Sequence, residues 1–492
     1  MRKNILYISL LGSFIFGCDD FLEEDLQGTY SNSTFYQTAE HAELALTGVY
    51  NAVSFSDVRN NLWVFGDVAS DDAVKGGQPG DQNDIQFIDE FSYQPSNSYL
   101  NNLWKHYYEG ITRANYLLAS LPAIEMDETR KDEIEGEALF LRSYFYFHLV
   151  NLFGELPLKL KPPLTSDQIH VPLSSVEAIY EQIDEDLETA ALMLPTETDG
   201  RASAGSAWGL LAKSRLFQED YQGALDAISE LDAVTSYGLV PLYTDNFTLG
   251  NQANQEAVFS IRHLSETSPK LGSYLNQYFA PQTENGYFFN APTQNFVDEF
   301  EVTSGDVVDP RLDYSVGREG STWLNGETYD PTWSPTGFIG KKHLQPLSEV
   351  PKGTKGDGGL DYVFMRYAEV LLMKAEALNE LNRGAEALAP LNEVRKRARE
   401  SYLFDESLSG FGAVPAELLA DVVTTDKNQL REAIRHERRV ELGLEFHRFY
   451  DLMRYGESTA EGALSSSTNF SYEEHRYFVL PLSETDINQA IN

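Results

Sequence analysis

The fold of this chain is decided by two stretches of similar sequence, LLAKSRLFQEDYQGA at residues 210–224 and LLMKAEALNELNRGA at residues 371–385. The two align with Leu-Leu, Lys, Glu and Gly-Ala in the same places. In each, apolar residues recur at the spacing of an amphipathic helix, and a short polar turn leads into a second helix. Chance similarity between two amphipathic helices is the alternative. The repeat predicts helical hairpins that bury their apolar faces against one another.

Further amphipathic helices are predicted in the first half of the chain. The strongest covers 133–153, where apolar residues follow the helical period and Gly154 provides the stop. Weaker patterns cover 39–53, 100–121 and 174–194. Together with the repeat, these segments predict a mostly α-helical scaffold of tetratricopeptide-like hairpins.

Residues 240–361 have a different texture, rich in Gly, Pro, Asn, Thr and aromatic residues and without a sustained helical period. Such sequence predicts loops and short strands. A long irregular segment within a helical protein is usually functional, because scaffolds carry their binding residues on loops.

The last predicted helix covers about 427–455 and combines many charges with regularly spaced apolar residues. Within it, Arg438 and Glu441 are three residues apart, and so are Glu445 and Arg448. Residues at this spacing are neighbours on a helix surface, so both couples are expected to form ion pairs.

The N-terminus has the pattern of an export signal. A basic start at Arg2 and Lys3 precedes an apolar run from Ile5 to Phe16, which is short for a membrane span. Gly17 and Cys18 end the run, and the acidic stretch DDFLEED follows. This pattern resembles a bacterial lipoprotein signal, which implies cleavage before Cys18 and acylation of its thiol. An uncleaved signal anchor is the alternative.

Charge and cysteine content exclude several classes of function. The chain has 492 residues with 37 Lys and Arg against 76 Asp and Glu, a formal charge of −39. Nucleic acid binding needs a surplus of basic groups, so it is excluded. A polyanionic ligand is disfavoured too, although a local basic pocket could override the average. Because Cys18 is the only cysteine, no intramolecular disulfide or cysteine zinc site can form.

Catalytic signatures are absent from the sequence. It contains no nucleophile elbow, phosphate-binding glycine loop or dinucleotide fingerprint. His436 and Glu437 begin like a zinc-protease helix, but position 440 is Val, so the second histidine is missing. A glycosidase needs only two carboxylates, which keeps a surface hydrolase open as an alternative. No catalytic residue and no cofactor are predicted.

Two acidic strings could offer oxygen ligands to calcium, although neither fits the spacing of a calcium loop. Solvated turns are the favoured interpretation, and no metal site is predicted. The strings are Asp67, Asp71 and Asp72, and Asp306, Asp309 and Asp313.

The tryptophans divide into core and candidate binding residues. Trp104 and Trp208 lie in predicted amphipathic helices and are expected in the core. Trp63 follows Asn60 and Asn61 and precedes an acidic loop.

Trp323, Tyr329 and Trp333 occur in REGSTWLNGETYDPTWSPTG, a loop sequence without an apolar period to bury them. Exposed aromatic faces can stack on sugar rings while amides bond the hydroxyls. Trp323, Trp63, Trp333, Tyr329 and Asn61 are therefore predicted to bind a glycan. The alternative is that the rings pin the loop to the scaffold.

Several segments, taken together, resemble the SusD/RagB family of outer-membrane nutrient-binding lipoproteins. They are Cys18 with DDFLEEDLQG, EGEALFLRSYFYFHLVNLFGELPL (135–158), GRASAGSAWGLLAKSRLF (200–217), RYAEVLLMKAEALNEL (366–381), LNEVRKRA (391–398), IRHERRVELGLEFHRFYDLMRYG (434–456) and FVLPLSETDIN (478–488).

The resemblance implies about four tetratricopeptide-like units packed against a loop-rich, ligand-binding half. It also implies a glycan ligand, or a peptide in some members, and a SusC-like TonB-dependent transporter as partner. The protein is then a non-enzymatic lipoprotein on the outer face of the outer membrane. A helical-repeat adaptor without a small ligand is a third alternative. The predicted regions are a signal peptide (1–17), an N-terminal helical-repeat region (18–239) and a C-terminal region (240–492) with a loop-rich insertion (240–361) and closing helices (362–492).

Overall fold

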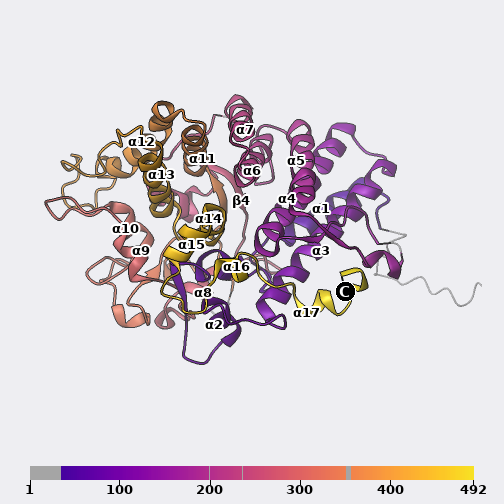
Figure 1. Ribbon diagram of the computed structural model, residues 1–492, viewed down its shortest axis with the longest axis horizontal. Helices are drawn as coiled ribbons and strands as arrows, with labels where there is room; N and C mark the ends of the chain where they lie inside the picture. The colour runs from indigo at the N-terminus through magenta and orange to yellow at the C-terminus, as the bar shows by residue number, and fades with distance from the viewer. Residues whose placement is uncertain (1–34, 164, 199, 235, 351–355, 492) are drawn as a thin grey trace, which may run out of the picture.

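The structure is a computed structural model that describes residues 35–163, 165–198, 200–234, 236–350 and 356–491. Packed pairs of helices make up most of it, and successive pairs lie side by side across the molecule (Figure 1). This confirms the predicted mostly α-helical fold of tetratricopeptide-like hairpins. The pairs are α1 (Ala39–Asn51) with α3 (Ser98–Ser120), α4 (Glu128–Phe153) with α5 (Val176–Met193), α6 (Ala204–Phe217) with α7 (Tyr221–Val234), and α11 (Tyr367–Glu380) with α12 (Gly384–Glu400).

Local sequence sets the ends of these helices. The Ser175 side chain caps α5 by accepting from the backbone N–H of Ala178, and Ser203 and Ser206 form a reciprocal capping box on α6. Helix α4 ends at Gly154, whose φ of 70° few residues other than glycine adopt readily. The helices predicted from the repeat and from the apolar periods are thus confirmed, with ends shifted by a few residues.

Residues 240–361 form short elements, as predicted. Of the small antiparallel sheets, β1–β5 and β4–β8 connect this region to other parts of the chain. The strand pairs are β1 (Ala73–Gly76) with β5 (Phe289–Pro292), β2 (Leu156–Pro157) with β3 (Leu173–Ser174), β4 (Ala257–Ile261) with β8 (Tyr362–Arg366), and β6 (Val316–Gly317) with β7 (Ile339–Gly340). The remaining helices are η2 (Val64–Val68), a π-helix, α2 (Asn83–Asp89), α8 (Leu275–Phe279), α9 (Gln294–Asp298), α10 (Pro310–Ser315), α13 (Lys427–Leu442), α14 (Arg448–Tyr455), α15 (Glu457–Ala463), α16 (Tyr472–His475) and α17 (Leu482–Thr485).

One large hydrophobic core runs through both halves of the chain, from Ala42 to Phe478. Trp104 is buried in it as expected, and Trp208 is half-buried against it. The core contains residues from both sides of position 240. The boundary at 239/240 stays a prediction made from the sequence. Within the described residues, no helix is both long and apolar enough to span a membrane.

The last predicted helix is broken in two, so a continuous helix over 427–455 is wrong. Helix α13 ends at Leu442 and α14 begins at Arg448. Between them Leu444 and Phe446 have φ values of 63° and 70°. The break is stabilised by a tertiary contact, because the backbone N–H of Phe446 donates to Oδ1 of the Asp67 carboxyl group at 3.0 Å instead of continuing the helix.

The predicted ion pairs within this helix are also wrong. Arg438 pairs with Glu369 and Asp451, each at 2.7 Å, rather than with Glu441. Arg448 pairs with Asp71 at 2.7 Å rather than with Glu445. The charged sides of α13 and α14 pack against other elements. The ion-pair partners of Arg438 and Arg448 therefore come from those elements and not from the next helical turn.

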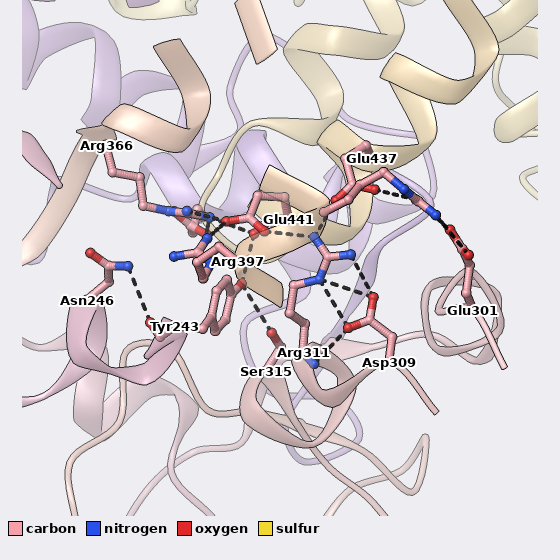
Figure 2. Close-up of polar contacts among 12 residues, drawn as sticks. Tyr243, Asn246, Glu301, Asp309, Arg311, Ser315, Arg366, Arg397, Glu437 and Glu441 are labelled. Atoms are coloured by element: carbon pink, nitrogen blue, oxygen red, sulfur yellow. Dashed lines mark hydrogen bonds and ion pairs between the residues drawn. The ribbon is translucent and has the colours of Figure 1, made fainter. Parts of the chain in front are cut away.

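A buried network of ion pairs joins α13 to the irregular region. Glu441 accepts hydrogen bonds from the guanidinium groups of Arg366 at 2.5 Å and Arg311 at 2.8 Å (Figure 2). Arg397 also pairs with Glu441. These arginines hold the pKa of the Glu441 carboxyl well below its usual range, against the opposing effect of burial. The charges of this helix therefore brace the scaffold.

Candidate ligand-binding site

A cavity of about 500 Å³ opens between the N-terminal helices and the irregular region. Its volume falls within the range of about 300–1,000 Å³ usual for small-ligand sites. Aromatic rings and uncharged polar groups dominate its lining. The lining residues are Val58, Asn61, Trp63, Asp81, Gln82, Ser98, Tyr99, Asn102, Tyr278, Tyr287 and Phe289.

Several distant segments bring these residues together. Trp63 immediately precedes the π-helix η2, and Tyr99 lies in the first turn of α3. Tyr278 is on α8, and Phe289 is the first residue of β5. Pairing of β5 with β1, in which Phe289 is opposite Gly76, holds the irregular region beside the N-terminal segment.

Four of the rings form a continuous aromatic wall. Trp63 stacks on Phe289 with 5.9 Å between ring centroids and 23° between planes. Trp63 and Tyr278 are also 5.9 Å apart, while Tyr287 is 6.5 Å from Tyr278 and 5.9 Å from Phe289. Tyr287 is 39% exposed, so its ring borders the opening. Trp63 and Phe289 are buried, so the ring surface on which a flat apolar group can stack belongs to Tyr287 and the half-buried Tyr278.

Two buried polar atoms at this wall have no hydrogen-bond partner among the described residues. They are Oδ1 of Asn61 and Nε1 of Trp63, one acceptor and one donor. The Asn61 amide is held in place because its Nδ2 donates to the Tyr99 carbonyl at 3.3 Å. An unsatisfied buried polar atom costs about 1–3 kcal/mol, so both atoms are suited to bond a ligand or water in the cavity.

Hydroxyl groups add further polar contacts. The Tyr99 hydroxyl donates to Oε1 of Gln82 at 2.9 Å. Burial raises the pKa of the Tyr99 and Tyr278 phenols, so both stay protonated at neutral pH. Apart from Asp81, which is paired with Lys75, the described polar lining residues present amides and hydroxyls.

The sequence-predicted site residues separate into two groups. Asn61 and Trp63 line the cavity, whereas Trp323, Tyr329 and Trp333 are not among its lining residues. The expectation of exposed rings is wrong for Trp63, which is 1% exposed although it lines the cavity. It is also wrong for Trp323 and Tyr329, because each is only 2% exposed. Their rings pack on one another and on the half-buried Trp333, with centroids 5.3–5.6 Å apart. Whether any of these residues contacts a ligand remains a prediction.

Sequence reasoning missed Tyr99, Tyr278, Tyr287 and Phe289. Tyr99 lies in an amphipathic helix, where an aromatic residue is most simply explained by core packing. The other three lie in the irregular region, and the aromatic richness of 270–290 was a signal that could have found them.

The acidic strings have structural partners, and the prediction of solvated turns is wrong for most of them. Asp67, Asp72 and Asp309 are each at most 1% exposed. Among the described residues, no group of three or more His, Cys, Asp or Glu side chains could hold a metal ion. The contacts are Asp67 with Asn290, Asp71 with Arg439 and Arg448, Asp72 with Arg439, Asp309 with Arg311, and Asp313 with Arg318; Asp306 is exposed. Cys18 lies outside the described residues.

Comparison with known proteins places the chain in a family. A family model described as "SusD family" matches residues 251–480, and one described as "Starch-binding associating with outer membrane" matches residues 20–216. The chain belongs to the SusD/RagB family. Two curated SusD-like proteins of Formosa agariphila support this assignment. P38 is 28% identical over 468 residues, covering 89% of this chain and 88% of its own. P2 is 27% identical over 522 residues, covering 100% and 98%.

Solved structures of SusD-like proteins share the fold. A laminarin-binding SusD-like protein superposes with a TM-score of 0.76 at 28% identity, covering 92% of this chain and 98% of its own. A SusD-like carbohydrate-binding protein from Bacteroides fragilis gives a TM-score of 0.78 at 23% identity, covering 93% and 100%. At that identity the second likeness concerns the fold alone.

Proposed function

We propose that this SusD/RagB protein binds a glycan in its aromatic cavity at the cell surface and passes it to a TonB-dependent transporter, without catalysis. The observation that carries the proposal is the pairing of ring faces with unsatisfied polar atoms in one cavity. Tyr287 is 39% exposed in this cavity lining, and Asn61 and Trp63, each with a buried polar atom that has no partner among the described residues, line the same cavity. A sugar ring has an apolar C–H face and a rim of hydroxyls, which matches both features.

The laminarin-binding relative supports a carbohydrate ligand, since it shares 28% identity and the fold over nearly the whole chain. The exposed Tyr287 would then be the stacking platform, while Trp63, which is 1% exposed, would support the wall by packing on Phe289. Asn61 would accept from one sugar hydroxyl, and the Trp63 indole N–H would donate to another.

The charges in the cavity support binding rather than hydrolysis. Glycosidases use two carboxyl groups on opposite sides of the scissile bond. Among the described lining residues, Asp81 is the only carboxylate. It is engaged by Lys75, whose Nζ lies 2.9 Å from Oδ1. A surface hydrolase acting in this cavity would lack its second carboxyl group.

Anchoring and partner belong to the same proposal. The signal pattern ending at Cys18 supports a lipid anchor, and the family model named for outer-membrane association begins at residue 20. A glycan bound at the cell surface must cross the outer membrane before the cell can use it. We therefore propose that a SusC-like TonB-dependent transporter receives the glycan. The proposed regions are a signal peptide at 1–17, an N-terminal helical-repeat region at 18–239 and a C-terminal region at 240–492.

A panel of purified polysaccharides tests the proposed function. Affinity gels and calorimetry should detect binding of at least one glycan, and reducing-sugar assays should detect no product. Tyr287→Ala should weaken binding about ten- to hundred-fold by removing a stacking face. Phe404→Ala is the matched control, because Phe404 is 51% exposed and lies outside the cavity. Binding that survives Tyr287→Ala unchanged would place the ligand elsewhere, and released sugar would support the hydrolase.

A further inference from the structure

No described residue that lines the cavity carries a positive charge that could receive an anion. None of these lining residues is Lys, Arg or His, and the one carboxylic acid among them is Asp81. Proteins that bind carboxylated or sulfated ligands place Arg or Lys against those groups. The aromatic cavity thus offers stacking and neutral hydrogen bonds only.

Lys75, the cation that pairs with the lining residue Asp81, already uses all of its donors. Nζ of Lys75 donates to Oδ1 of Asp81 at 2.9 Å, to its carbonyl oxygen at 2.9 Å and to the Gln78 carbonyl at 3.3 Å. An ammonium group has three donors, and all three are used. The Lys75 side chain is 6% exposed, so it cannot turn toward a ligand without breaking these bonds.

Other charged residues beside the cavity are also paired or acidic. Arg59, next to the lining residue Val58, is paired with Asp57 at 2.7 Å and Glu109 at 2.8 Å. The lining residue Ser98 donates both its backbone N–H and its hydroxyl to the carboxylate of Asp84, at 2.8 and 2.5 Å. The exposed Lys105, further along α3, is not a lining residue.

We propose that the cavity selects uncharged glycans and rejects chains carrying uronate or sulfate groups at the bound units. This inference rests on the proposed glycan-binding function and adds the substrate class. An anionic group entering the cavity would lose water, find no cation and approach Asp81. Both desolvation and like-charge repulsion then oppose binding. The formal charge of −39 adds repulsion at longer range.

Matched derivatives of one polymer test the selection. Each neutral polysaccharide that binds in the panel is compared with its own carboxymethylated and sulfated derivatives by calorimetry. We expect the anionic forms to bind at least about tenfold more weakly, because like charges brought together at an interface are strongly unfavourable. The long-range part of this difference should shrink at high ionic strength, where the Debye length falls to about 3 Å at 1 M salt.

A variant with an added positive charge at the cavity tests the same selection, because it should improve the binding of anionic glycans. Val58 lines the cavity and is 54% exposed, so Val58→Lys places an ammonium group at the opening with little disturbance of the core. The ratio of anionic to neutral affinity should rise by about three- to tenfold in Val58→Lys. It should stay at the wild-type ratio in Val58→Gln, a neutral control that also carries a polar group.

The outcomes separate the inference from the function beneath it. Equal or tighter binding of an anionic derivative, or binding of anionic polysaccharides alone in the panel, would overturn the selection while leaving glycan binding intact. A ratio that does not change in Val58→Lys would also count against it. Absence of binding to every polysaccharide would remove the proposed function, and the inference with it.

Discussion

The indole Nε1 of Trp323 donates a 2.7 Å hydrogen bond to Oε1 of Glu284. Glu284 lies three residues before Tyr287, in the segment that forms one side of the aromatic cavity. Trp323 is 2% exposed and packs against Tyr329 and Trp333. Trp323, which the sequence placed foremost in the site, is therefore not a lining residue of this cavity, but its hydrogen bond to Glu284 holds the segment that carries Tyr287.

Trp323→Ala should destabilise the protein, because it removes a large buried ring. Aromatic-to-alanine changes in a core cost about 3–5 kcal/mol. Trp323→Phe keeps most of the packing but removes the N–H. It should cost less stability while still weakening glycan affinity by a few-fold through the loosened Glu284. Denaturant unfolding and calorimetry on the same samples measure both effects. A Trp323→Ala variant as stable as wild type would contradict this placement of the ring.

Asn61→Leu should separate binding from stability. The Asn61 Oδ1 atom is buried without a partner among the described residues. Leucine removes that unsatisfied acceptor but also the 3.3 Å hydrogen bond from Nδ2 to the Tyr99 carbonyl, so the two effects oppose one another and the free energy of unfolding should change by no more than about 1 kcal/mol. Glycan affinity should fall, since the hydroxyl acceptor is gone. Thermal denaturation and affinity gels provide the comparison. Unchanged affinity would show that Asn61 does not contact the ligand.

Arg439→Ala should lower stability without touching the cavity. Arg439 pairs with Asp72 at 2.8 Å and Glu299 at 2.6 Å, and its side chain is 6% exposed. Removing one partner of a buried pair costs about 3–5 kcal/mol, because the remaining charge is uncompensated. Arg383→Ala is the control, since its pair with Glu386 is exposed and such pairs contribute about 0–1 kcal/mol. A stable Arg439→Ala variant that failed to bind glycan would assign this helix to the site.

Asp67 should make stability fall as pH rises. Burial raises the pKa of its carboxyl from the ordinary 3.8 to about 8, so the folded protein holds a proton that the unfolded chain releases. The free energy of unfolding therefore declines from about pH 4 to about pH 8. A protonated Asp67 could donate to Oδ1 of Asn290, which has no partner in the described residues, if that amide is turned over.

Asp67→Asn keeps the shape of the protonated acid at every pH. The part of the decline that Asp67 causes should disappear in this variant, which is checked by denaturant unfolding across the pH range. Identical slopes in the wild type and Asp67→Asn would show that Asp67 is ionised throughout.

Cys18→Ala should release the protein from membranes or leave it uncleaved, because acylation of the thiol is no longer possible. Stable tethering needs more than one lipid chain, which lipoprotein processing is expected to supply. Fractionation of cells and protease treatment of intact cells measure the anchor and its orientation. Full protection of the wild-type protein in intact cells would contradict a surface location.

The sequence alone was sufficient to predict the helices of the scaffold, because a helix is indicated by the spacing of apolar residues within one segment. The apolar periods of 133–153 and the repeat at 210–224 and 371–385 predicted hairpins that the structure contains. These patterns need only the geometry of neighbouring turns. The segments that resemble the SusD/RagB family also identified the protein family from the sequence, because each of them is a run of consecutive residues.

The binding cavity and the charge pairing were decided by the tertiary structure. Trp63 meets Phe289, and Arg448 meets Asp71, across more than two hundred residues of chain. No local period carries that information, because contact between distant segments depends on how whole elements pack. Exposure follows the same rule. Trp323 and Tyr287 both lie in irregular sequence, yet packing buries the first and leaves the second at the opening.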